Sequence, residues 1–140
     1  MANLLGVLIF AAVLARLDVV EPQTQRALSA VAAESLAPGV PTILLHAFYA
    51  GWLIALMVWM LPGAENAKAL TIIVLTYLIG LGGFAHVIAG STDALYAAIR
   101  GETSLGHAVG GYILPTLVGN VVGGVSMVAA LNHAQATSGE

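Results

Sequence analysis

The chain has 140 residues, of which 59% are hydrophobic and only 8% carry a formal charge, with a net charge of −3. Soluble domains use charged residues at about 25% of their positions, and so few charges could not cover the surface of a soluble domain of this size. The mean hydropathy of +0.95 therefore predicts an all-α integral membrane protein. The net negative charge gives no sign of a nucleic-acid partner. The lack of cysteine excludes disulfides, iron–sulfur clusters and thiolate metal sites.

Apolar runs predict about four transmembrane segments joined by short polar turns. Residues 1–16 form the first run, which ends at Arg16. Residues 17–41 hold scattered charges and three prolines, which suits an interfacial helix and a loop rather than a crossing. Residues 42–61 form a second span without formal charge, and Pro62 and Gly63 end it.

The third apolar segment, residues 69–100, is expected to be broken by three glycines close together, Gly80, Gly82 and Gly83. Each glycine inside a helix costs about 1 kcal/mol relative to alanine, so the cluster predicts a break over about residues 80–85. In a membrane, a broken backbone is tolerated only where it is buried in protein or lines a cavity, and half-helix N-termini there attract anions.

The last span, residues 106–132, is rich in glycine. Two pairs have the small-xxx-small spacing that lets helices approach closely, Gly106 with Gly110 and Gly119 with Gly123. Pro115 predicts a kink in this helix. Residues 133–140 read as a short polar tail, which we expect to be disordered.

An internal similarity suggests two repeats. Residues 2–6, Ala-Asn-Leu-Leu-Gly, resemble residues 119–123, Gly-Asn-Val-Val-Gly, and an apolar run follows each. If these are equivalent helices, the last repeat has two spans before its Asn-x-x-Gly helix and the first has none. We therefore expect that two further spans of the protein are missing before residue 1.

Three stretches resemble the C-terminal half of the formate/nitrite transporters. They are residues 48–59, residues 83–89 (Gly-Phe-Ala-His-Val-Ile-Ala) and residues 114–124 (Leu-Pro-Thr-Leu-Val-Gly-Asn-Val-Val-Gly-Gly). That family has an aquaporin-like fold of six spans in two inverted repeats, with a broken second and fifth span, and forms pentamers with one pore per protomer. The resemblance implies that the four predicted segments are the third, fourth, broken fifth and sixth spans.

The resemblance also implies a pore site at the break. It makes His86 the central pore histidine, with Phe84 beside it and Ile79 where the family has an aromatic constriction residue. Differences from the family pattern, such as Ala85 in place of an acidic residue and the additional Asp93, place the chain closer to a divergent subgroup of inner-membrane homologues.

Elementary electrostatics gives His86 a role in such a pore. A bare anion crossing an apolar constriction must be paired or protonated, and imidazole exchanges a proton near neutral pH. We expect Asn120, on the neighbouring glycine-rich helix, to orient His86. The alternative for His86 is a packed histidine bonded to a carbonyl, and His46 is expected to be of this packed or interfacial kind. Asp93 is either part of a helix cap with Ser91 or a pore residue.

The resemblance thus implies a multi-pass protein of the bacterial inner membrane that carries small monovalent anions of weak acids, such as formate or nitrite. Each protomer is expected to hold its own pore, and the complete protein to be a homo-pentamer. No catalytic residues, cofactor or metal site are expected. The alternatives are a truncated, non-transporting membrane fragment and a small helical membrane assembly subunit. The resemblance also implies that the arginine-rich side is periplasmic and the C-terminus cytoplasmic.

Overall fold

The structure is a computed structural model that describes residues 2–17 and 19–138, and these residues form helices and no strands. The helices are α1 (Ala2–Arg16), α2 (Pro22–Leu36), α3 (Val40–Met60), η1 (Leu61–Gly63), α4 (Lys68–Leu81), α5 (Val87–Ile99), η2 (His107–Ile113) and α6 (Leu114–Ser138). Pro22 stands at the first position of α2, as the sequence predicts, because its missing N–H has no partner to lose there.

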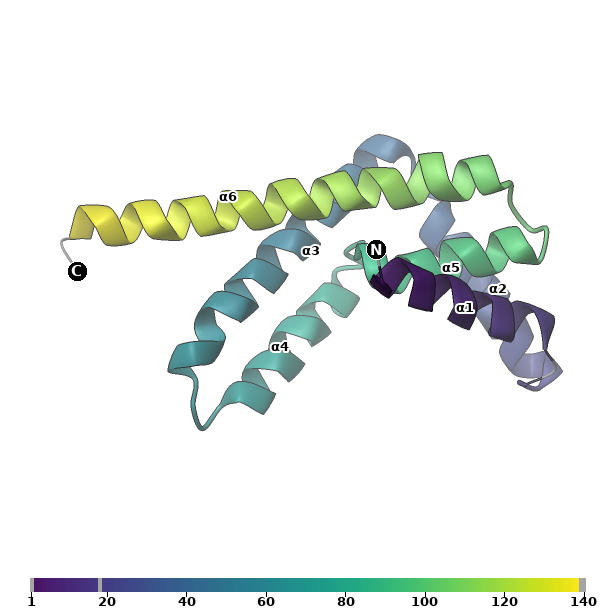
Figure 1. Cartoon of the computed structure of the whole chain (residues 1–140), viewed down its shortest axis with the longest axis horizontal. Coiled ribbons are helices and arrows are strands. Elements are labelled where there is room, and N and C mark those ends of the chain that lie inside the picture. The colour runs from purple at the N-terminus through teal and green to yellow at the C-terminus, as the bar shows by residue number, and fades with distance from the viewer. Residues whose placement is uncertain (1, 18, 139–140) are drawn as a thin grey trace.

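The helices form two groups that share α6 as a common edge (Figure 1). On one side, α3 and α4 run antiparallel to each other, and α3 packs closely on α6. On the other side, α1 and α2 pack on α5. The junction between α4 and α5 lies between the two groups, near the middle of the molecule.

Two helices in the described part of the chain are long and apolar enough to cross a bilayer: Val40–Gly63, with 24 residues, and His107–Thr137, with 31 residues. The other apolar helices are shorter. At about 1.5 Å per residue, the 14 residues of α4 reach about 21 Å, less than the roughly 30 Å of a hydrocarbon core. The predicted fifth span would therefore need α4 and α5 together, and the number of four spans stays a prediction.

Glycines bring α3 and α6 into backbone contact. A Cβ atom at Gly51 would lie 2.7 Å from the Cα atom of Asn120, and one at Gly119 would lie 2.7 Å from the carbonyl oxygen of Leu44. Gly123 meets the backbone of Phe48 in the same way. The predicted close packing at Gly119 and Gly123 is confirmed.

The other predicted glycine pair does not pack. A Cβ atom at Gly110 would meet nothing within 4 Å, and one at Gly106 would meet only the hydroxyl of Ser104, at 3.9 Å. Gly106 lies just before the π-helix η2, and both glycines are exposed. Within the described residues this pair therefore makes no helix contact, because the spacing indicates a smooth face but does not determine whether another helix covers it.

Pro115 does not bend the last helix sharply, because η2 and α6 run on from one another (Figure 1). The residues before Pro115 form a π-helix, in which the N–H of Leu114 donates to the carbonyl of Val109. This wider turn shifts the hydrogen bonds by one residue and accommodates the proline, which lacks an N–H. The predicted kink is replaced by a local change of helix type.

The predicted disordered tail is also wrong for residues 134–138, which continue α6 as far as Ser138. Alanines at positions 134 and 136 are strong helix formers. The hydroxyl of Thr137 donates to the carbonyls of His133 and Ala134, each at 3.0 Å, so this polar side chain is satisfied on the helix itself. Residues 139 and 140 lie outside the described part of the chain.

Candidate functional site

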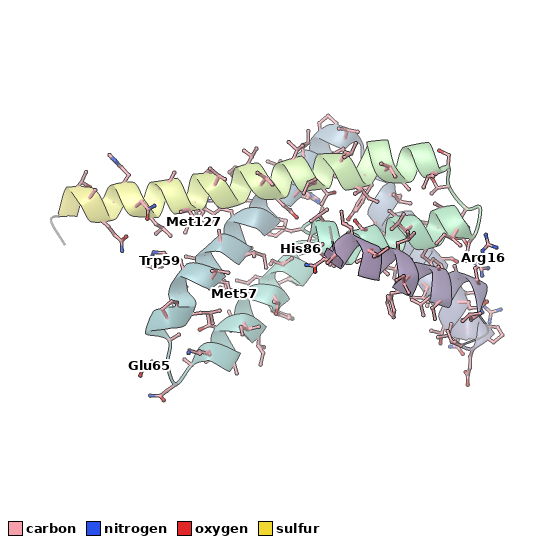
Figure 2. All side chains as sticks on the ribbon, in the orientation of Figure 1. Arg16, Met57, Trp59, Glu65, His86 and Met127 are labelled. Atoms are coloured by element: carbon pink, nitrogen blue, oxygen red, sulfur yellow. The ribbon has the colours of Figure 1, made fainter. Side chains whose placement is uncertain are left out.

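The predicted break is present, and it begins two residues later than expected. Helix α4 continues through Gly80 to Leu81, residues 82–86 are not helical, and α5 begins at Val87. Figure 2 shows His86 at this junction, far from Arg16 at the end of α1. The glycines therefore end one helix, and the next helix starts directly after the histidine.

Gly83 makes the end of α4 possible. Its φ angle is +60°, the left-handed region that side chains with a Cβ atom avoid. This turn lets the N–H of Phe84 donate to the carbonyl of Ile79 at 3.0 Å, and the N–H of Gly83 donate to the carbonyl of Gly80 at 3.1 Å. The pair of bonds is a Schellman motif, which satisfies the last carbonyls of α4.

Asn120 of α6 holds the other side of the break. Its Oδ1 accepts a hydrogen bond from the N–H of Val87 at 2.8 Å, and its Nδ2 donates to the carbonyl of Ala85 at 2.9 Å. The same Nδ2 donates to the carbonyl of Ala47 in α3 at 2.8 Å. One amide thus joins α3, α6 and the peptide groups on both sides of His86.

This arrangement corrects two expectations. Asn120 does not hydrogen-bond the ring of His86, and it positions the histidine through the flanking backbone instead. Ser91 and Asp93 do not cap the second half-helix, because α5 already begins at Val87, with His86 as the residue before its first turn. The amide of Asn120 takes the place of a side-chain cap by accepting the N–H of Val87.

His46 is packed, as expected, but it lies at the break, which the sequence did not predict. Its Nδ1 is 3.1 Å from the carbonyl oxygen of Gly83, so this nitrogen carries the hydrogen and donates it. Its ring also meets Phe84 edge-on, with the centroids 6.1 Å apart. The sequence contains one signal for this role, since His46 is the one side chain of an otherwise uncharged span that can become positively charged.

A cavity of about 550 Å³ opens beside the break. Most of the predicted site residues line it, namely Ile79, Gly80, Gly83, Phe84, His86 and Asp93. Gly82 and Asn120 are not among its lining residues, because Gly82 packs against the ring of Phe84 and Asn120 lies behind the backbone. The structure therefore brings together, at one cavity, predicted residues that span 14 positions of the sequence, from Ile79 to Asp93.

The lining residues that were not predicted include Ser35 of α2, His46 of α3 and Tyr112 of η2. The hydroxyl of Ser35 donates to Oδ2 of Asp93 at 3.1 Å, which ties α2 to the wall of the cavity. Tyr112 packs so closely on Gly90 that a Cβ atom there would meet its ring at 2.7 Å. No sequence motif marks Ser35 or Tyr112, because their place depends on how α2 and η2 fold back over α5.

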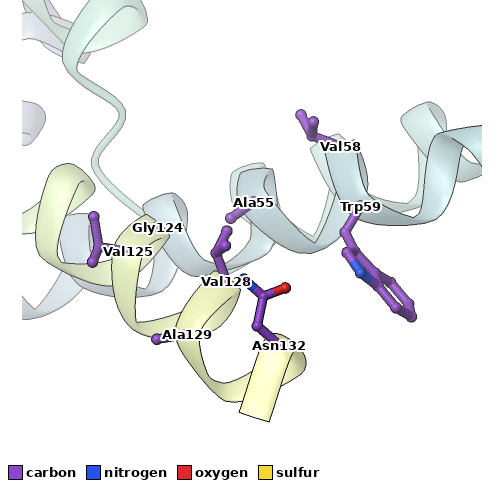
Figure 3. A pocket seen from close by; sticks show the side chains of 8 residues that line it. All are labelled: Ala55, Val58, Trp59, Gly124, Val125, Val128, Ala129 and Asn132. Atoms are coloured by element: carbon purple, nitrogen blue, oxygen red, sulfur yellow. The ribbon is translucent and has the colours of Figure 1, made fainter. Parts of the chain in front are cut away.

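A second hollow, of about 640 Å³, lies away from the break between the far halves of α3 and α6 (Figure 3). It is lined by small and branched apolar side chains, with Trp59 and Asn132 as the polar exceptions. It contains no charged group, and it belongs to the outer apolar surface of the helix pair. A tryptophan in such a place suits packing or the membrane interface, because its ring is apolar apart from one N–H.

Comparison with known proteins agrees with the resemblance described above. Residues 1–134 match the model of the family described as formate/nitrite transporter. The chain is 34% identical over 135 residues to "Inner membrane protein YfdC" of Escherichia coli (strain K12), and the aligned region covers 96% of the chain and 44% of that protein. It is 33% identical over 104 residues to "Uncharacterized transporter YrhG" of Bacillus subtilis (strain 168), covering 73% of the chain and 39% of that protein. No solved structure matches the chain.

The chain therefore belongs to the formate/nitrite transporter family. Its helices and apolar composition agree with a membrane protein of that family, which is one of transporters rather than enzymes. The chain spans less than half the length of the two relatives.

Proposed function

We propose that this protein takes part in the transmembrane transport of small monovalent anions of weak acids, formate and nitrite being examples, through a pore within each protomer. The observation that carries the proposal is the glycine break, at which His86 lines a cavity of about 550 Å³ in a member of a transporter family. The complete protein would be a multi-pass homo-pentamer of the bacterial inner membrane, and the present chain would supply its C-terminal half.

His86 suits the centre of such a pathway. It is half-buried, and its ring makes no hydrogen bond within the described residues, so both nitrogens are available to a ligand. The backbone that carries it is held on both sides by Asn120, which keeps the ring at the edge of the cavity. A fixed imidazole can donate a hydrogen bond to an anion, or pass it a proton, without a large rearrangement.

The start of α5 adds a second attraction. The helix dipole places partial positive charge at Val87, directly after His86. Free N–H groups in the first turn and the imidazole therefore act on the same part of the cavity. His46, whose Nδ1 is engaged by the carbonyl of Gly83, leaves Nε2 as a possible acceptor on the facing helix. In this proposal His86 exchanges the proton, and His46 holds the shape of the break.

The replacement of His86 by asparagine tests the proposal. We expect His86→Asn to assemble normally but to lose most of the dependence of flux on pH between 5 and 8, because asparagine keeps a polar group and cannot exchange a proton. Flux of formate, nitrite and similar weak-acid anions into proteoliposomes is measured with the protein in its complete assembly. A His86→Asn variant that keeps the parent's pH profile for a transported substrate contradicts the proposal.

The matched control is His133→Asn. His133 is exposed on the last turns of α6, away from the break, so its replacement leaves the cavity unchanged. His46→Asn is a poor control because it removes the bond to Gly83. If His133→Asn changes the pH profile as much as His86→Asn does, the effect belongs to the protein surface and not to the pore.

A further inference from the structure

The charges on the cavity wall are unusual for a pathway that carries anions. Two carboxyl side chains line the cavity, Asp93 of α5 and Glu34 of α2, and no lysine or arginine is among the described lining residues. The basic groups present are the imidazoles of His46 and His86, and a neutral imidazole does not offset a carboxylate. The wall therefore carries net negative charge whenever Asp93 is ionised.

Asp93 is fixed in this position. It is half-buried, and the hydroxyl of Ser35 donates to its Oδ2 at 3.1 Å. It lies in the second turn of α5, and His86 stands directly before the first turn, so about 10 Å of helical rise separates the two positions, and both side chains line the cavity. A substrate that moves along the cavity wall between the α2 side and the break must pass the carboxyl group.

A fixed carboxylate in a partly desolvated cavity repels an anion much more strongly than it does in bulk water, because the surroundings screen the charge less. At a separation of about 6 Å, one such charge lowers the local concentration of a monovalent anion by about tenfold and raises that of a cation in proportion. A neutral acid is unaffected. The same wall therefore treats the two protonation states of one weak acid differently.

We propose that Asp93 is a specificity-determining residue that disfavours bare anions on its side of the cavity, so that a weak acid passes Asp93 in its neutral form before it reaches the imidazole of His86. This role for Asp93 refines the proposed function, and its consequence for transport rests on that function. A weak acid passes the Asp93 side in its protonated form, whereas anions of strong acids, such as nitrate and chloride, are excluded. The other titratable groups that face Asp93 across the cavity are Glu34, His46, His86 and Tyr112.

The exclusion depends on pH in a defined direction. Protonation of the Asp93 carboxyl group removes its negative charge, and protonation of the His86 imidazole adds a positive one. Both changes make the wall less negative, so anion entry rises as the pH falls. Tyr112 remains neutral over the same range and does not contribute.

The absence of cysteine from the chain allows a test that does not depend on transport. Ala89 is exposed and lines the cavity, one helical turn before Asp93. In an Ala89→Cys variant, the rates of modification by an anionic and a cationic methanethiosulfonate reagent, sulfonatoethyl and trimethylammonioethyl, are compared after correction for their rates with a free thiol. We expect the cation-to-anion ratio to fall by about a hundredfold when Asp93→Asn is added, because the anion gains about tenfold and the cation loses about tenfold.

Two controls accompany the test. Glu102→Gln removes a carboxylate from the loop after α5, outside the cavity, and is expected to leave the ratio at position 89 unchanged. A cysteine at Ala129, on the outer groove of α3 and α6, reports any general effect of Asp93→Asn on the reagents. Asparagine can still accept the bond from Ser35, so Asp93→Asn removes the charge and keeps the contact.

The proposal is overturned if Asp93→Asn leaves the ratio at position 89 unchanged, or if Glu102→Gln lowers it equally. Flux of formate and nitrate in the complete assembly then gives a separate answer about transport. A parent protein that carries no weak acid contradicts the proposed function, while the labelling ratio still decides the role of Asp93. With transport present, Asp93→Asn is expected to raise the flux of nitrate relative to formate by about tenfold.

Discussion

Asn120 shows how one side chain can make a broken helix stable. The break frees backbone groups that a continuous helix would pair, and the amide of Asn120 bonds the N–H of Val87 and the carbonyl of Ala85. A third bond, to the carbonyl of Ala47, fixes the amide to α3. A buried polar backbone group without a partner costs about 1–3 kcal/mol, so this side chain stabilises the site at the residue level.

We expect Asn120→Ala to lower the stability of the purified protein by about 2 kcal/mol or more, because the replacement leaves the N–H of Val87 without its acceptor. The apparent melting temperature in detergent measures the change. Asn132→Ala is the matched control, since Asn132 lies three turns further along α6 and is exposed. Equal melting temperatures for the two variants would contradict the role given to Asn120.

At the scale of single residues, the sequence predicts some parts of the site and not others. The glycine cluster and His86 could be predicted, because three glycines in four positions are a strong local signal for a break. The bond between His46 and Gly83 could not, since it joins residues 37 positions apart and depends on how α3 and α4 pack. Asn120 was correctly placed near the site, but its contact with the backbone rather than with the ring of His86 requires the geometry.

At the scale of elements, glycines decide which helices approach each other. Gly119 and Gly123 lie against the backbone of α3, where any Cβ atom would collide, whereas Gly110 faces open space. The same sequence spacing therefore has two different meanings in one helix. The positions of the helices and of the break could be predicted from the sequence. The helix that packs against each glycine-rich face could not, because the spacing of glycines carries no information about the neighbouring helix.

We expect Gly123→Ala to separate α3 from α6 and to lower stability by about 2 kcal/mol, because the added methyl group would meet the backbone of Phe48. Gly110→Ala should be neutral or slightly stabilising, since nothing lies within 4 Å of the new atom and alanine is the better helix former. Thermal unfolding of both variants in one detergent gives the comparison. A loss for Gly110→Ala as large as that for Gly123→Ala would contradict this account.

At the scale of the whole molecule, the two helix groups leave large apolar surfaces uncovered. Leu81 of α4 is 70% exposed and Leu5 of α1 is 60% exposed. In a bilayer such faces contact lipid or other protein helices. The composition predicted this membrane character, and the match to the transporter family supports it.

The resemblance to the family predicts that the complete protein is a homo-pentamer. We expect the detergent-purified assembly to have five times the mass of one protomer, as measured by light scattering coupled to size-exclusion chromatography. Variants that leave helix packing intact, such as His133→Asn, should give the same mass. A stable monomer at every detergent concentration tested would count against the family arrangement.

The position of Asn120 has a consequence for biosynthesis. Helices α3, α4 and α5 are made before α6, so the break must emerge from the ribosome before the amide that bonds it exists. Until then, the N–H of Val87 and the carbonyl of Ala85 require water or another polar partner, because neither can remain unpaired in lipid. We therefore expect the segment 82–86 to keep water or another polar partner until α6 is inserted and Asn120 bonds it.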